Sequence, residues 1–209
     1  MDKYKLIHKT AKEMMKDVRK DMLKVAMSSF KNVSDITDLD KLNKINSSFD
    51  RIFTKLVGVA ALQIVLQRDL EKVNDENPKE LQTSIAKAGI STEEFLKNCQ
   101  RSAAGSYNII NRYFALMTSI KPYENDDSLY SARRKYEYYK IGIVDMGTAM
   151  KKLEYQESFK DTVTPERDEQ INKIVDIVYT NTIVSKLKDD NINIDKLVEE
   201  IYTDKIKVK

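Results

Sequence analysis

The chain has few of the residues that form turns, and it has no tryptophan. Its 209 residues include 5 Gly and 3 Pro, well below the combined share of roughly 12% usual in globular proteins. An all-β sandwich or barrel needs many turns and is therefore excluded. With 41% hydrophobic residues the chain can bury a core, and with 33% charged residues it is more charged than the average globular protein, at about 25%. We expect long helices.

Cysteine and histidine each occur once, as Cys99 and His8. A single cysteine cannot form an intramolecular disulfide, which favours a reducing compartment. A single histidine excludes both a His-rich metal site and the paired Glu-x-x-His motifs of di-iron bundles. A Cys-His nucleophilic pair would need these two residues to meet. Because Cys99 lies on an apolar helical stripe, we interpret it as a small buried hydrophobic residue.

No apolar run is long enough to cross a membrane. The longest covers residues 56–66 and is interrupted by Gln63, whereas a spanning helix needs about 20 apolar residues. The N-terminus begins Met1-Asp2-Lys3 and stays charged, so it does not resemble a signal peptide. We therefore expect no membrane insertion and a cytoplasmic location, or the virion or host cytoplasm if the protein is of phage origin.

Apolar residues three and four apart predict where the helices lie. They indicate long helices over residues 4–30, 38–73, 91–120 and 129–153, and shorter ones over 78–85, 164–187 and 192–201. In the second helix the apolar positions alternate by three and four without a slip, which is typical of coiled-coil packing. We predict an all-α, elongated antiparallel bundle of six to seven helices with coiled-coil-like seams. Residues 1–209 are expected to form a single domain, with a weaker division near 156–164 before a C-terminal helical pair.

Four glycines stand inside these predicted helices, at positions 58, 105, 142 and 147. Glycine in a helix interior costs about 1 kcal/mol relative to alanine. Each position is therefore predicted to be a close helix crossing, with a kink or a ligand-facing notch as the alternative.

Residues that carry enzyme chemistry are sparse. The acids on the long helices that a carboxylate metal site would use are Asp50, Asp69, Asp145 and Asp176, but most have basic neighbours at helical spacing and are interpreted as ion pairs. The segment 86–89 lacks both the first glycine and the Lys-Ser/Thr ending of a phosphate loop. We therefore expect no enzyme, no catalytic residue, no cofactor and no metal.

A partial helix-turn-helix pattern covers residues 81–100, with a short helix, Gly89 and a second helix capped by Ser91. The second helix begins with Glu93 and Glu94, whose carboxylates would repel phosphate. Asn98 stands where that motif buries an apolar residue. We favour an ordinary joint between two helices.

Charge is divided between the two ends of the chain. Residues 1–31 hold 9 Lys and Arg against 4 Asp and Glu, a net of +5, whereas residues 161–209 hold 8 against 11, a net of −3. The first helix carries a basic stripe of Lys5, Lys9, Lys12, Lys16, Lys20 and Lys24, a pattern found on surfaces that bind nucleic acid, acidic membranes or acidic partners. Interleaved Glu13, Asp17 and Asp21 favour a solvated face of ion pairs instead. Contact between unlike ends of neighbouring copies also fits this division.

Residues 130–140 combine four of the 11 tyrosines with four basic residues. Arginine and aromatic side chains are enriched at protein interfaces and also stack on single-stranded bases. Tyr136 and Tyr139 fall on the apolar stripe and are predicted to face the core. The predicted interaction patch is therefore Tyr130, Arg133, Arg134, Tyr138 and Lys140, against the alternative of core packing with a solvated rim.

These patterns favour a non-enzymatic structural or adaptor protein that acts through protein–protein contacts and self-association. The abundance of Lys, Ile and Asn suits an AT-rich genome, so within that class we expect a phage virion or assembly component of connector or ring type. The alternative is a nucleic-acid-binding or regulatory protein that uses the basic first helix and the 133–140 patch.

Overall fold

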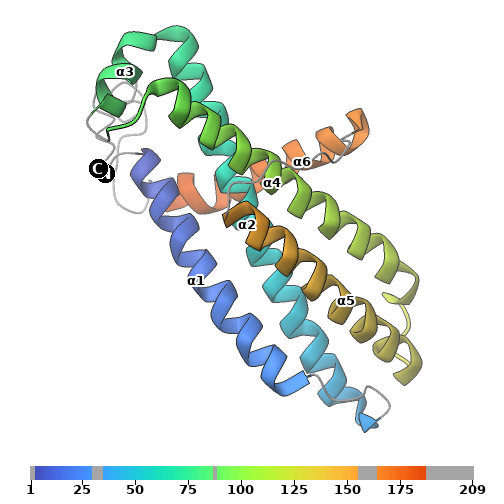
Figure 1. The fold of residues 1–209 in the computed structure, drawn as a ribbon. Helices are drawn as coiled ribbons and strands as arrows, with labels where there is room; N and C mark the ends of the chain where they lie inside the picture. The colour runs from blue at the N-terminus through green and yellow to red at the C-terminus, as the bar shows by residue number, and fades with distance from the viewer. Residues whose placement is uncertain (1–2, 30–34, 87–88, 155–163, 187–209) are drawn as a thin grey trace.

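The computed structural model describes residues 3–29, 35–86, 89–154 and 164–186, and these residues form helices and no strand (Figure 1). The elements are α1 (Lys3–Ser29), α2 (Leu39–Glu76), α3 (Pro78–Ala86), α4 (Thr92–Ile120), α5 (Leu129–Glu154) and α6 (Pro165–Val178), with a 3₁₀ turn η2 (Lys121–Tyr123) and a π-helical turn η3 (Tyr179–Val184). The all-α prediction is confirmed. The predicted C-terminal helix lies outside the described residues, as do positions 156–163 of the predicted division.

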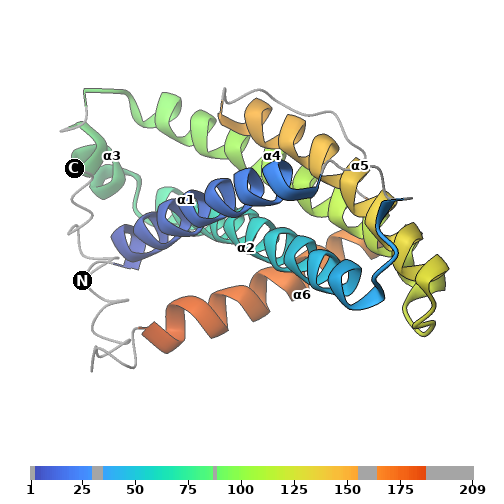
Figure 2. The same ribbon diagram turned by 90° about the horizontal axis from the view of Figure 1, so that it is seen from below.

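The longest helix, α2, lies at the centre, and α1, α4, α5 and α6 all pack against it (Figures 1 and 2). α1 and α2 run antiparallel side by side, and α4 and α5 do the same. Every residue over positions 56–62 is buried, as are Ile64 and Val65. A helix that is apolar all round is one enclosed by its neighbours. The middle of α2 is therefore buried on all sides, beyond the single apolar seam that its spacing predicted.

Three helices begin directly after a residue whose side chain caps their first turn. The side chains of Asp38, Ser91 and Thr164 accept hydrogen bonds from the backbone N–H three residues later, at 3.1, 3.1 and 3.3 Å. Each bond satisfies one of the free N–H groups in the first turn. The starts of α2, α4 and α6 thus follow from local sequence.

Two of the mid-helix glycines lie at close helix crossings, as predicted. A Cβ added at Gly58 in α2 would lie 2.7 Å from Met14 Cε of α1. A Cβ added at Gly142 in α5 would lie 3.0 Å from Leu116 Cδ2 of α4. Both distances are shorter than normal van der Waals contact, so a hydrogen at these positions leaves room for the side chains of Met14 and Leu116 on the neighbouring helices.

At two other glycines, replacement by alanine should change the stability of the fold in opposite directions. Gly89 has φ +73° and open space around its Cα, so Gly89→Ala should destabilise the fold by about 1 kcal/mol through the left-handed backbone alone. Gly147 is helical, and an added Cβ would lie 3.7 Å from Met22 Cε, an ordinary contact. Gly147→Ala should therefore stabilise by up to about 1 kcal/mol. Urea unfolding of both variants checks the pair, and shifts of the same sign would contradict it.

Candidate interaction surface on the outer face of α5

One side of α5 is buried against the bundle, and the opposite side carries apolar residues in solvent. Residues at helical spacing form this second side, and we call them the outer face of α5: Tyr130, Arg134, Glu137, Tyr138, Ile141, Val144, Asp145 and Thr148. Tyr130, Ile141 and Val144 expose 64%, 66% and 62% of their surface. Tyr136 and Tyr139 on the other side are buried, as predicted. α5 therefore presents an apolar stripe that the described residues leave uncovered.

The N-terminal part of the outer face is a cluster of aromatic rings around an arginine. Tyr123 of η2 has its ring centre 6.3 Å from that of Tyr130 and 6.2 Å from that of Tyr138. The Arg134 guanidinium lies 5.6 Å from the Tyr138 ring centre, and its Nη1 is 2.8 Å from Glu137 Oε2. A hydrogen bond with Tyr123 and the charge of Glu137 raise the pKa of Arg134. These contacts hold the cluster in one arrangement, which lowers the entropy lost on binding.

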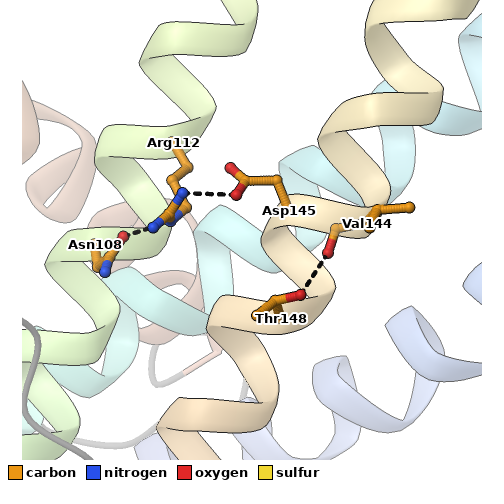
Figure 3. A network of polar contacts seen from close by, with 5 residues as sticks. All are labelled: Asn108, Arg112, Val144, Asp145 and Thr148. Carbon is orange, nitrogen blue, oxygen red and sulfur yellow. Dashed lines mark hydrogen bonds and ion pairs between the residues drawn. The ribbon is translucent and has the colours of Figure 1, made fainter.

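A polar network borders the other part of the outer face (Figure 3). Arg112 of α4 donates from Nε to Asn108 Oδ1 at 2.6 Å and from Nη1 to Asp145 Oδ1 of α5, also at 2.6 Å. Asn108 is 2% exposed, so this network reaches into the packed interior. Thr148 Oγ1 donates to the Val144 carbonyl at 3.0 Å, and the Val144 side chain points away from Arg112. Asp145, a candidate metal ligand in the sequence, is instead in an ion pair.

The predicted patch is divided by the helix geometry. Tyr130, Arg134 and Tyr138 come together on the outer face, with Tyr130 exposed and the other two half-buried. Arg133 turns away, and its Nη2 donates to the Ile36 carbonyl at 3.1 Å. Lys140 is half-buried and lies about 100° around the helix from its neighbour Ile141.

Sequence reasoning missed Ile141 and Val144, the most apolar residues of the outer face. Their spacing of three residues, off the stripe that contains Tyr139 and Ile143, is a visible signal of a second apolar side. It also missed Tyr123, which joins the cluster only because the turn η2 places it beside Tyr130 and Tyr138.

The basic stripe on α1 is exposed wherever its side chains are described, namely at Lys9, Lys12, Lys16, Lys20 and Lys24; the side chain of Lys5 lies outside that description. Glu13 lies 3.9 Å from Lys9 in an ion pair whose members are both more than half exposed, so the pair adds little stability. Asp21 instead turns to α2, where its Oδ2 accepts from Lys55 Nζ at 2.9 Å. That bond lowers the pKa of Asp21. One of the three interleaved acids is thus engaged with α2.

The remaining candidates for chemistry lie apart from this face. Cys99 is half-buried against the core, and burial, with a smaller effect of Glu71, raises the pKa of its thiol to about 11. His8 and Asp176 are exposed on α1 and α6, while Asp69 is half-buried on α2. Burial and Glu124 raise the pKa of Asp50. Among the described residues, no group of three or more His, Cys, Asp or Glu is placed to hold a metal ion.

The helix-turn-helix pattern of the sequence falls on α3 and α4. Gly89 adopts the positive φ expected after a helix end, and Glu93 and Glu94 are exposed in the first turn of α4. Asn98 is half-buried. The carboxylates therefore stand where a reading helix would meet phosphate, while positions 87 and 88 of the turn are outside the described residues.

Within the described ranges, no helix combines the length and the apolar character that crossing a membrane requires. Comparisons of the chain with protein-family models, with curated proteins and with solved structures give no match.

Proposed function

We propose that the chain is a non-enzymatic structural or adaptor protein that self-associates through the outer face of α5. Within this class we propose a phage virion or assembly component of connector or ring type, for which the supporting feature is composition alone: the Lys, Ile and Asn content of the sequence. The self-association has more direct support in the side chains of α5.

The observation that supports self-association is the placement of Tyr130, Ile141 and Val144 on a single side of one helix, each more than 60% exposed. Fully burying an aliphatic side chain contributes roughly 1.5–3 kcal/mol. Tyrosine and arginine are among the residues that most often dominate binding energy at interfaces, and Tyr138 and Arg134 adjoin the aliphatic pair. An apolar centre beside a fixed aromatic cluster is the arrangement of a protein-binding surface.

The experiment is light scattering after size exclusion, over a range of protein concentrations. We expect a discrete oligomer, and Ile141→Glu with Val144→Glu should weaken its association at least tenfold, because two carboxylates would have to be desolvated. The matched control is Leu23→Glu with Ile177→Glu, since these residues are 64% and 58% exposed on α1 and α6. The proposal fails if the wild-type chain is a monomer throughout, or if the α5 variant and the control behave alike.

A nucleic-acid-binding or regulatory protein is the second candidate, and the exposed lysines of α1 favour it. Its patch on α5 is reduced, because Arg133 is bonded to Ile36 and Arg134 to Glu137. The affinity of electrostatic binding to phosphates would fall steeply as the salt concentration rises. Purified protein that carries nucleic acid, and sheds it as the salt concentration rises, would favour this candidate over self-association.

A further inference from the structure

We propose that α1 binds the surface of an acidic lipid bilayer through its basic face, without crossing the bilayer. The basic face of α1 consists of exposed lysines on one side of the helix and an exposed leucine among them: Lys9, Lys12, Lys16, Lys20, Lys24 and Leu23. These residues belong to a different helix from the outer face of α5, so the proposal does not depend on self-association.

The basic face is held on the bundle as a formed helix. Ile7, Ala11, Val18 and Val25 on the opposite side of α1 are buried, and α1 packs along α2 (Figure 2). The basic face therefore points to solvent, with its residues recurring over about 21 Å of helix. Binding would not require α1 to fold, so the entropy lost on association is small.

Positive charge outweighs negative charge on this side of the molecule. Of the exposed side chains over positions 8–24, six are basic and two are acidic. The hydrogen bond from Lys55 lowers the pKa of Asp21, and the charges of Lys24 and Arg51 lower it further. Arg51 is exposed on α2, so the positive region continues onto the neighbouring helix. Each lysine close to an acidic bilayer raises the affinity about fivefold.

Leu23 favours lipid over nucleic acid as the ligand. It is 64% exposed, and a turn of 100° per residue places it between Lys12 and Lys16 around the helix axis. The phosphate backbone of a nucleic acid gives a leucine side chain no apolar contact, and the exposed residues over positions 8–24 include no aromatic ring that could stack on bases. A bilayer offers anionic headgroups to the lysines and acyl chains just below them to the leucine.

Co-sedimentation with vesicles tests the charge of this surface. We expect binding to phosphatidylcholine vesicles that contain about a quarter phosphatidylserine, weakening as the salt concentration rises, and none to pure phosphatidylcholine. Lys12→Glu with Lys16→Glu should weaken binding at least tenfold. The matched control is Lys97→Glu with Lys121→Glu, which makes the same change of charge at exposed positions of α4 and η2. Equal losses in the two variants, or no binding by the wild-type chain, would overturn the proposal.

A second readout uses the lack of tryptophan in the chain. Leu23→Trp places a single indole on the basic face, and its emission should shift to the blue with acidic vesicles, because the ring enters the boundary between headgroups and acyl chains. Ile177→Trp is the control, since Ile177 is 58% exposed on α6 and its replacement should show no shift. Equal shifts at the two positions, or a shift at position 23 with duplex DNA and none with vesicles, would overturn lipid binding by this face.

Discussion

Phe49→Ala is expected to destabilise the fold by about 3–5 kcal/mol, the range observed when a buried aromatic residue is truncated. Phe49 is 2% exposed, and its ring centre lies 6.5 Å from that of Phe53, 5.9 Å from Tyr136 and 5.7 Å from Tyr139. Such pairs contribute about 0.5–1.5 kcal/mol each beyond the area that they bury. Because the four rings come from α2 and α5, the substitution opens a cavity where these two helices meet.

Urea unfolding at neutral pH measures this effect as a shift of the midpoint at unchanged slope. Tyr130→Ala is the control, because it removes a ring of similar size from the exposed side of α5 and should cost well under 1 kcal/mol in the unassociated protein. A loss below 1 kcal/mol for Phe49→Ala would show that the ring cluster does not join α2 to α5 in solution.

The positions of the helices could be predicted from the sequence because residues close to each helix end determine where it begins and ends. Ser91 caps the start of α4. The helix ends at Ile120, two residues before Pro122, because proline disfavours continuation of a helix. Both ends therefore follow from neighbouring residues. The buried stripe of α5, including Tyr136 and Tyr139, follows from a period of 3.6 residues. Local signals of this kind do not need knowledge of which helix packs on which.

The arrangement of side chains between helices depends on contacts between residues distant in sequence. It was therefore harder to predict from the sequence. Arg133 and Arg134 are adjacent and were predicted to share a patch, but they point about 100° apart, one to the segment before α2 and the other to the aromatic cluster. Asp21 was interpreted as part of an ion-paired face of α1, yet Lys55 lies within 2.9 Å on α2. All-round burial of α2 likewise requires four neighbours, whose placement no local pattern indicates.

Stability should fall as the pH rises above 10, and Tyr139→Phe should remove part of this fall. Tyr139 is 6% exposed. Burial, and to a smaller extent Asp50, Tyr113 and Glu124, raises the pKa of Tyr139 far above its ordinary value. In the unfolded chain this tyrosine ionises near pH 10, whereas in the folded chain it keeps its proton. The unfolded state therefore loses a proton first, and the stability present below pH 10 is lost as the pH rises toward the folded pKa.

Each pH unit in this window costs about 1.4 kcal/mol for a tyrosine that stays protonated only in the folded state. Burial also raises the pKa of Tyr113 and of Tyr136, and both remain in the Tyr139→Phe variant, so the difference between variant and wild type isolates Tyr139. Urea midpoints measured between pH 8 and pH 11.5 should diverge only above pH 10, with the wild type losing stability faster. Parallel curves would mean that the Tyr139 hydroxyl reaches solvent, and that the junction of α2 and α5 opens without unfolding of the chain.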